Sequence, residues 1–189
     1  MREAFEAEAY DEALALTKEK VRASGVAELM PIVDFELTDS PSITLDNLNE
    51  FLEECDDRIV SIFLQMNGFD LNHDRWFFDC LAYRSYQNED ADLDWLADWQ
   101  AEWVDYGLDG AEGAQAAFRW YHEEKVFEKR PEIKDTYRAA RLVVLCKFVC
   151  FARDVLAAGE LARNVVVLVS AHDFELIARM NRGALTRGR

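Results

Sequence analysis

The sequence predicts an α+β protein: a small, mainly antiparallel sheet of three to four strands packed against five to six helices. Three observations support this class. Several segments show the apolar spacing of amphipathic helices, two neighbouring runs are rich in β-branched and aromatic residues, and one late run is continuously apolar. The 189 residues, half of them hydrophobic, fit one domain over 1–189, with a frayed tail expected from about residue 183.

The first third of the chain is predicted to form a helix, a strand and a second helix. Residues 2–23 are rich in Ala, Glu and Leu, and Gly25 is a plausible stop. Residues 32–37 suggest a short strand that leads into a Ser-Pro turn. Thr44 is expected to cap the next helix, which carries an apolar face as far as Cys55.

The strongest β signal lies in residues 58–86. Residues 59–66 are rich in β-branched and aromatic side chains, and residues 75–83 form a second strand-like run. Asn67 and Gly68 open a polar connection between the two runs. We therefore expect an antiparallel hairpin with a long loop.

Residues 92–110, with the sequence DLDWLADWQAEWVDYGLDG, place three tryptophans four residues apart. That spacing suits one face of a strand and nearly one face of a helix, so spacing alone does not decide. Because Ala, Leu, Asp, Glu and Gln are poor strand formers, composition favours a helix. Its tryptophans are expected to face the core and its acids the solvent. The two arcs would be Trp95, Trp99 and Trp103, and beside them Asp94, Asp98, Glu102 and Asp105.

The last third is predicted to hold two long helices, a strand and a short final helix. Residues 112–129 are amphipathic, and residues 131–158 are apolar nearly all round in their middle, which marks a buried central helix. Residues 164–171 are a β-branched run typical of an interior strand. Asp173 is expected to cap a last helix over residues 174–181.

The net charge of −16 is unevenly distributed along the chain. Residues 1–118 hold 28 acids and 7 bases, whereas residues 119–189 hold 9 acids and 14 bases. Residues 23–57 and 85–118 contain no Lys or Arg. Such a field would repel nucleic acid and anionic membranes and attract a basic protein. The alternative is that the acids serve solubility alone.

The sequence is expected to be that of a bacterial-type cytoplasmic protein. No apolar run approaches the roughly 20 residues needed to span a bilayer, and the first residues lack a signal pattern. The cysteines lie scattered in apolar contexts without a C-x-x-C pair, so they are expected to be inert core thiols. They are Cys55, Cys80, Cys146 and Cys150.

No cofactor or metal is predicted. Neither G-x-x-x-x-G-K-S/T nor G-x-G-x-x-G occurs. Residues 69–79 begin like a calcium loop, but Arg75 and Leu81 stand where such a loop needs Gly and Glu. The histidines lack metal-ligand spacing. His73 is expected in solvent and His122 at the edge of the core.

The most enzyme-like pair is His172 and Asp173, which follow the apolar run 164–171. Catalytic groups often project from strand ends, and a His–Asp pair can orient a general base. However, neighbouring residues of an extended chain point apart, and no G-x-S-x-G nucleophile turn is present. The two residues are therefore secondary candidates for catalysis, and the sequence favours a non-enzymatic protein over an enzyme.

The leading functional prediction is an acidic, non-catalytic protein-binding module. It would be an inhibitor or immunity-like protein that neutralises a basic target such as a nuclease, through acids that steer and tryptophans that anchor. Its partner-binding residues would be Asp94, Asp98, Glu102, Asp105, Trp95, Trp99 and Trp103. Two alternatives remain open: a small hydrolase-like enzyme using His172 and Asp173, and a structural domain that forms homo-oligomers.

Overall fold

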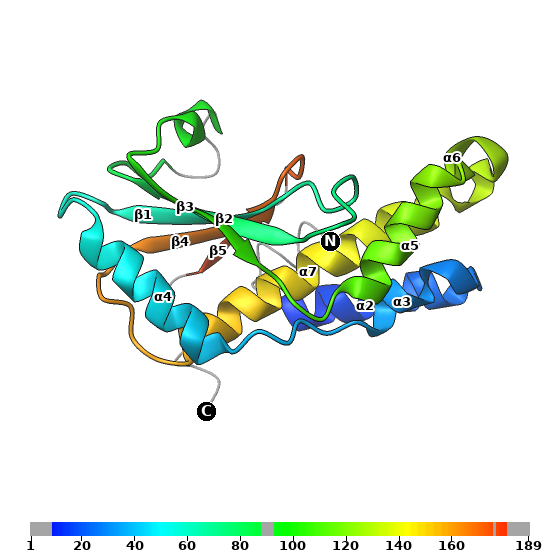
Figure 1. Cartoon of the computed structure of the whole chain (residues 1–189), viewed down its shortest axis with the longest axis horizontal. Coiled ribbons are helices and arrows are strands. Elements are labelled where there is room, and N and C mark those ends of the chain that lie inside the picture. Colours follow the sequence, from blue (N-terminus) through cyan, green and yellow to red (C-terminus); the bar gives the residue numbers. More distant parts are fainter. Residues whose placement is uncertain (1–8, 88–92, 176, 181–189) are drawn as a thin grey trace.

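A five-stranded mixed sheet occupies one end of the molecule, and helices cover one of its faces and extend beyond it as an arm (Figure 1). The computed structural model describes residues 9–87, 93–175 and 177–180. The strands are β1 (Ser61–Met66), β2 (Phe77–Tyr83), β3 (Ala101–Gly107), β4 (Val166–Ala171) and β5 (Ala178–Met180). The α-helices are α2 (Tyr10–Ala23), α3 (Met30–Asp34), α4 (Pro41–Glu54), α5 (Glu112–Glu123), α6 (Val126–Lys129) and α7 (Lys134–Ala157). Short 3-10 turns are η1 (Ala27–Leu29), η2 (Leu93–Ala97) and η3 (Pro131–Ile133).

The strand order is β3-β2-β1-β4-β5. The predicted hairpin is confirmed, because β1 and β2 pair antiparallel with Ser61 opposite Tyr83. The central pair β1 and β4 is parallel, and the β2–β3 and β4–β5 pairs are antiparallel. The α+β class is thus confirmed, but the expectation of a mainly antiparallel sheet of three to four strands is wrong. Two segments predicted as helices, at β3 and β5, form strands instead.

The main core lies between the sheet and the helices. Alternate residues of the central strands point towards α7, among them Ile62, Leu64 and Val167. The middle of α7 is buried on nearly all sides, which confirms a central helix within 131–158. Because the arm helices α2, α3 and α5 also pack around this element or one another, α7 joins the sheet to the arm (Figure 1).

The opposite face of the sheet carries a smaller apolar cluster. Phe63, Leu81, Tyr83 and Leu168 project from the strands, and Trp95 of η2 lies over them. The connection between β2 and β3 therefore serves as the cover of this second cluster.

The segment around α3 differs from the prediction. Residues 30–34 are helical, with Pro31 in the first turn, where a proline has no amide hydrogen to leave unpaired. The following residues are extended without being a strand, and the Thr38 amide donates to the Asp109 carbonyl at 3.1 Å. Helix α4 starts at Pro41 after Ser40, so Thr44 is not its cap. Instead the Thr44 hydroxyl is buried and bonds Tyr106 at 3.0 Å.

The predicted ends of the chain are only partly described. The structure places α2 within the expected helix 2–23, whereas residues 1–8 and the expected frayed tail lie outside the described residues. The predicted helix over 174–181 is wrong, because Ala178–Met180 pairs with β4 as strand β5. Ala178 and Met180 reach the main core from this edge strand, and this tertiary contact outweighs a weak local helical pattern.

Candidate functional site

The predicted tryptophan helix is wrong, and its three tryptophans lie in three different environments. Trp95 is only 9% exposed and packs edge-on against Tyr83, with ring centroids 5.1 Å apart. Trp99 follows η2 and is 45% exposed. Trp103 lies in β3, half-buried, and its ring packs edge-on against that of Tyr106, with ring centroids 5.0 Å apart. Pairing with β2 and packing on the helices therefore outweigh the poor strand propensity of this segment.

A β-bulge in β3 decides which side chains face the helices. Phe78 pairs with Tyr106 and Cys80 with Trp103, so two residues of β3 lie opposite the single residue Asp79. One of them, Asp105, has a left-handed backbone (φ 64°), and its amide donates to Asp79 Oδ1 at 2.9 Å. Because of this extra residue, Trp103 and Tyr106 both face the helices although they are three positions apart.

The four predicted acids are all exposed, although they do not lie on a helix. Together with two exposed apolar residues they form a surface that we name the acidic edge. It consists of Asp94, Asp98, Trp99, Glu102, Val104 and Asp105. Arg75 lies at one end of this edge: its Nη2 donates to the Asp105 carbonyl at 2.7 Å, and its guanidinium lies 3.9 Å from the Asp105 carboxylate. The ion pair itself is long and exposed to solvent, so it contributes little to stability.

Carboxylates behind the acidic edge lie close enough to affect one another. Burial raises the pKa of Asp79, and the negative charges of Asp105 and Glu102 raise it further. Burial likewise raises the pKa of Asp39, with the charge of Asp109 adding to the effect. Burial is the main cause of both upward shifts, and the charges of the neighbouring carboxylates add to it.

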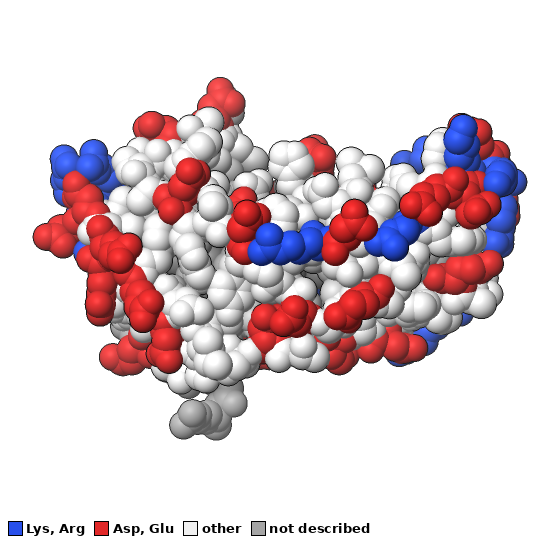
Figure 2. All heavy atoms as spheres, viewed as in Figure 1, with Lys and Arg blue, Asp and Glu red and all other residues white. Residues whose placement is uncertain are grey.

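Helix α4 extends the negative surface. It lies under β3, where Phe51 contacts the Trp103 ring with centroids 6.4 Å apart. Its exposed acids are Asp46, Glu50, Glu53 and Glu54. Figure 2 shows acidic side chains over α4 on this face, whereas acidic and basic side chains are intermixed at the α6 end of the arm.

A polar cluster that the sequence did not reveal lies where the β1–β2 connection meets α5 and α7. Asp70 pairs with Arg141 at 2.8 Å, and both side chains are largely shielded from solvent. His122 Nε2 is hydrogen-bonded to the Tyr137 hydroxyl at 2.8 Å. The His73 ring stacks on His122 with centroids 5.4 Å apart, so the expectation of a solvated His73 is wrong.

The physical effect of this cluster is on protonation. Burial lowers the pKa of His122, and the neighbouring His73 lowers it further because two adjacent imidazolium ions repel. Burial raises the pKa of Tyr137, and the charge of Asp70 adds to this. A charged residue such as Arg141 within an apolar helix was the available sequence signal, because a shielded charge needs a partner.

His172 and Asp173 form an exposed turn at the carboxyl end of β4. His172 Nε2 and Asp173 Oδ1 are 3.5 Å apart, and their side chains are 62% and 68% exposed. Asp173 has φ 64° and leads towards β5, so it does not cap a helix. Gly68, which follows β1, lies next to His172. The side chains of His172 and Asp173 are nevertheless exposed, whereas general-base catalysis uses a shielded geometry.

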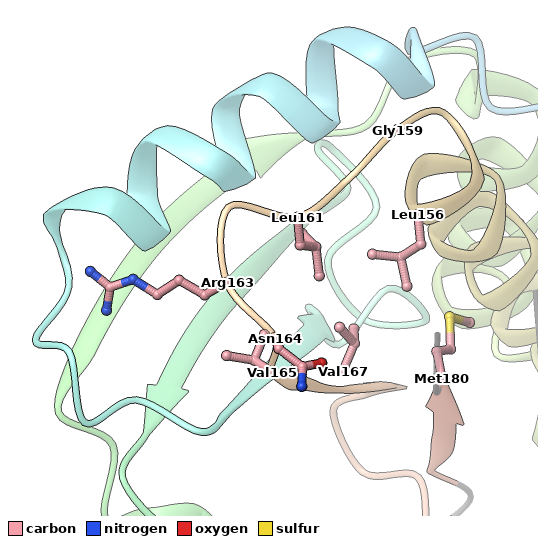
Figure 3. Close-up of a pocket in the computed structure, with 8 residues that line it drawn as sticks. All are labelled: Leu156, Gly159, Leu161, Arg163, Asn164, Val165, Val167 and Met180. Carbon is pink, nitrogen blue, oxygen red and sulfur yellow. The ribbon is translucent and has the colours of Figure 1, made fainter. Parts of the chain in front are cut away.

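The pocket of Figure 3 lies at the other, amino-terminal end of β4, away from His172. Its lining is mostly apolar and holds no acid, histidine, serine or cysteine: Leu156, Gly159, Leu161, Arg163, Asn164, Val165, Val167 and Met180. The Arg163 side chain extends away from the pocket (Figure 3) and donates to the carbonyls of Asp56 and Cys55 at 2.7 and 2.8 Å. The pocket therefore offers packing space but no reactive group.

The four cysteines are free and buried, as expected of core thiols. Burial raises the pKa of Cys146 to about 12 and that of Cys150 to about 11, which disfavours the reactive thiolate. In the described ranges, no group of three or more His, Cys, Asp or Glu side chains could hold a metal ion. Among the helices described, none combines the length and the apolarity needed to cross a membrane.

Comparisons of the chain with protein-family models, with curated proteins and with solved structures gave no match.

Proposed function

We propose that the protein is a non-catalytic protein-binding module whose acidic edge binds a basic protein. The observation that carries this proposal is the acidic edge itself. Four exposed carboxylates and the exposed Trp99 occur along η2, β3 and the turn between them, within a stretch, residues 85–118, that contains no Lys or Arg.

The binding mechanism would divide between charge and aromatic contact. The negative potential of the edge and of α4 would attract a basic surface and raise the association rate. Trp99 would then supply a large, rigid contact area at low conformational cost. Trp95 and Trp103 would support the surface from beneath, since both are packed against other rings.

An inhibitor or immunity-like protein is the type of module that fits best. An enzyme that acts on a polyanion, such as a nuclease, presents a cationic groove, and an acidic edge can occupy that groove. Binding of this kind needs no reactive group on the inhibitor. The exposed side chains of His172 and Asp173 give the hydrolase alternative little support.

The test compares two charge variants of equal size. One variant replaces the acids of the edge: Asp94→Asn, Asp98→Asn, Glu102→Gln and Asp105→Asn. The control replaces four exposed acids near α6: Glu123→Gln, Glu124→Gln, Glu128→Gln and Glu132→Gln. Basic proteins retained by the immobilised wild-type chain are purified, and their association rates are measured at two ionic strengths.

We expect the edge variant to associate about tenfold or more slowly at low ionic strength, with the difference shrinking as salt rises. The control should associate at nearly the wild-type rate. Recovery of no basic protein, or equal rates for all three chains, contradicts the proposal.

A further inference from the structure

We propose that the partner contributes a basic, extended segment that adds to the outer edge of β3 as a further strand. This inference rests on the proposed function and specifies how the acidic edge recognises its partner. Strand β3 is the last strand on its side of the sheet, and within the described residues no strand pairs with its outer side. An edge strand presents unpaired backbone groups that a partner strand can bond.

The two edges of the sheet are not equivalent. Strand β3 runs over seven residues, whereas β5 at the opposite edge has three and carries Arg179. The β3 edge is the one with acidic side chains. A basic strand is therefore directed to β3 rather than to β5.

The exposed side chains of β3 define what the added strand should look like. Glu102 lies between Ala101 and Trp103, which pack towards the main core, so Glu102 faces the other side of the sheet. Val104, two positions further, is 51% exposed. A strand that alternates Lys or Arg with apolar residues would place its cations on the face of Glu102 and its apolar side chains on the face of Trp103.

A second copy of this chain is a poor occupant of the same edge. Pairing β3 with β3 would bring Glu102 and Asp105 of one copy close to the same acids of the other, and like charges on neighbouring strands are destabilising. The bulge at Val104 and Asp105 also interrupts regular pairing, so the added strand is expected to lie mainly along the residues before it. Both features select a short, basic, foreign strand.

The probe for this mode is a blocked seven-residue peptide in which Lys and Val alternate, Ac-KVKVKVK-NH2. It has two twins with the same side chains and charge. One carries N-methyl groups on its three Val nitrogens, and the other carries them on its inner Lys nitrogens. Because successive amides of a strand point to opposite edges, each twin blocks one edge for hydrogen bonding.

We expect the full chain to bind the parent peptide, one twin to bind about tenfold or more weakly, and the other twin to bind like the parent. Equal binding of both twins and the parent, or equal weakening of both twins, overturns strand addition while leaving a charge-driven contact in place. A parent peptide that does not bind also overturns it, whereas the proposed function is tested separately on the whole partner.

Two chain variants locate the binding on β3. Val104→Arg adds one positive charge to the edge, and Leu16→Arg adds the same charge on α2, where Leu16 is 54% exposed. Thermal unfolding first checks that both variants fold. We expect Val104→Arg to raise the Kd of the parent peptide about tenfold and Leu16→Arg to leave it unchanged. Equal Kd values for the two variants would show that the peptide binds elsewhere and would overturn the inference.

Discussion

Trp99 and Trp103 are the same type of residue and lie four positions apart in the sequence, yet their surroundings differ. Trp103 contacts the rings of Phe51, Phe78 and Tyr106, whereas Trp99 is 45% exposed. A side chain that contributes to stability is one that contacts other side chains in the folded chain. The spacing of the tryptophans carries no information on that point.

Replacing each of these tryptophans with alanine should separate stability from binding. We expect Trp103→Ala to lower the free energy of unfolding by about 2–3 kcal/mol, because a half-buried ring leaves its aromatic partners. Trp99→Ala should change it by less than about 0.5 kcal/mol. Urea unfolding followed by circular dichroism measures both. Similar losses in the two variants would mean that Trp99 is packed in solution.

At the scale of elements, the helices and strands that were predicted correctly are those with a regular apolar pattern in the sequence. The hairpin β1–β2, the buried helix α7 and the strand β4 each bury a regular apolar pattern, so local pattern and tertiary context agree. Strands β3 and β5 lie at the edges of the sheet, where pairing with one neighbour decides the structure.

The candidate site was predicted only in part, as were the elements that form it. The exposure of the acids was expected, because charged residues prefer water in a helix and in a strand alike. The bulge at Asp105 was not, since it depends on the hydrogen bond that the Asp105 amide donates to Asp79 and on the contact between Tyr106 and Thr44 of α4. The stacking of His73 on His122 was likewise hidden, because the two residues are brought together only by the folded chain.

The turn between β3 and α5 provides a test of how closely these elements are fitted. Gly110 has φ +86°, and a Cβ built there would lie 2.3 Å from the Glu36 carbonyl oxygen. Gly25 also has a positive φ, +66°, but a Cβ there would meet nothing within 4 Å. The two glycines therefore share the backbone conformation and differ in the available space.

We expect Gly110→Ala to lower the free energy of unfolding by more than about 2 kcal/mol, because backbone strain and a backbone clash add together. Gly25→Ala should cost about 1 kcal/mol, from backbone conformation alone. Chemical denaturation of the two variants gives the comparison. A loss at Gly110 no larger than that at Gly25 would show that the segment around Glu36 shifts freely.

At the scale of the whole molecule, the connection between β1 and β2 ties the sheet to the helical arm. Asp70 reaches Arg141 on α7, Asp74 pairs with Arg119 on α5 at 2.8 Å, and His73 stacks on α5. These contacts lie at the carboxyl end of β1, beside its parallel neighbour β4. Protonation of this junction should therefore affect global unfolding.

The junction predicts loss of stability in acid. The pKa of His122 is lower in the folded chain than its ordinary value of 6.5, so the unfolded chain binds this proton more readily. The stabilising contribution is complete above about pH 7 and is lost as the pH falls through the ordinary value towards the lowered folded one. The negative charge of Asp70 raises the pKa of His122 and so opposes this effect, whereas the positive charge of Arg141 lowers the pKa as burial does.

The variant His122→Gln provides the control, because it can still bond the Tyr137 hydroxyl and does not titrate. Unfolding free energies are measured in urea from about pH 7 to about pH 5. We expect the wild-type value to fall more steeply than that of the variant over this range. Parallel curves would mean that the two states of the chain bind the His122 proton equally.

The connection that covers the second apolar cluster has a thermodynamic consequence. Trp95, which closes that cluster, lies in the same short stretch of chain as Asp94 and Asp98. A ligand that binds these two carboxylates also stabilises the packing of Trp95 on the cluster. Ligand binding and Trp95 packing are therefore linked equilibria, and each favours the other by the same free energy. Loosening the interior beneath Trp95 would thus weaken the grip at the surface without removing a single contact to the ligand.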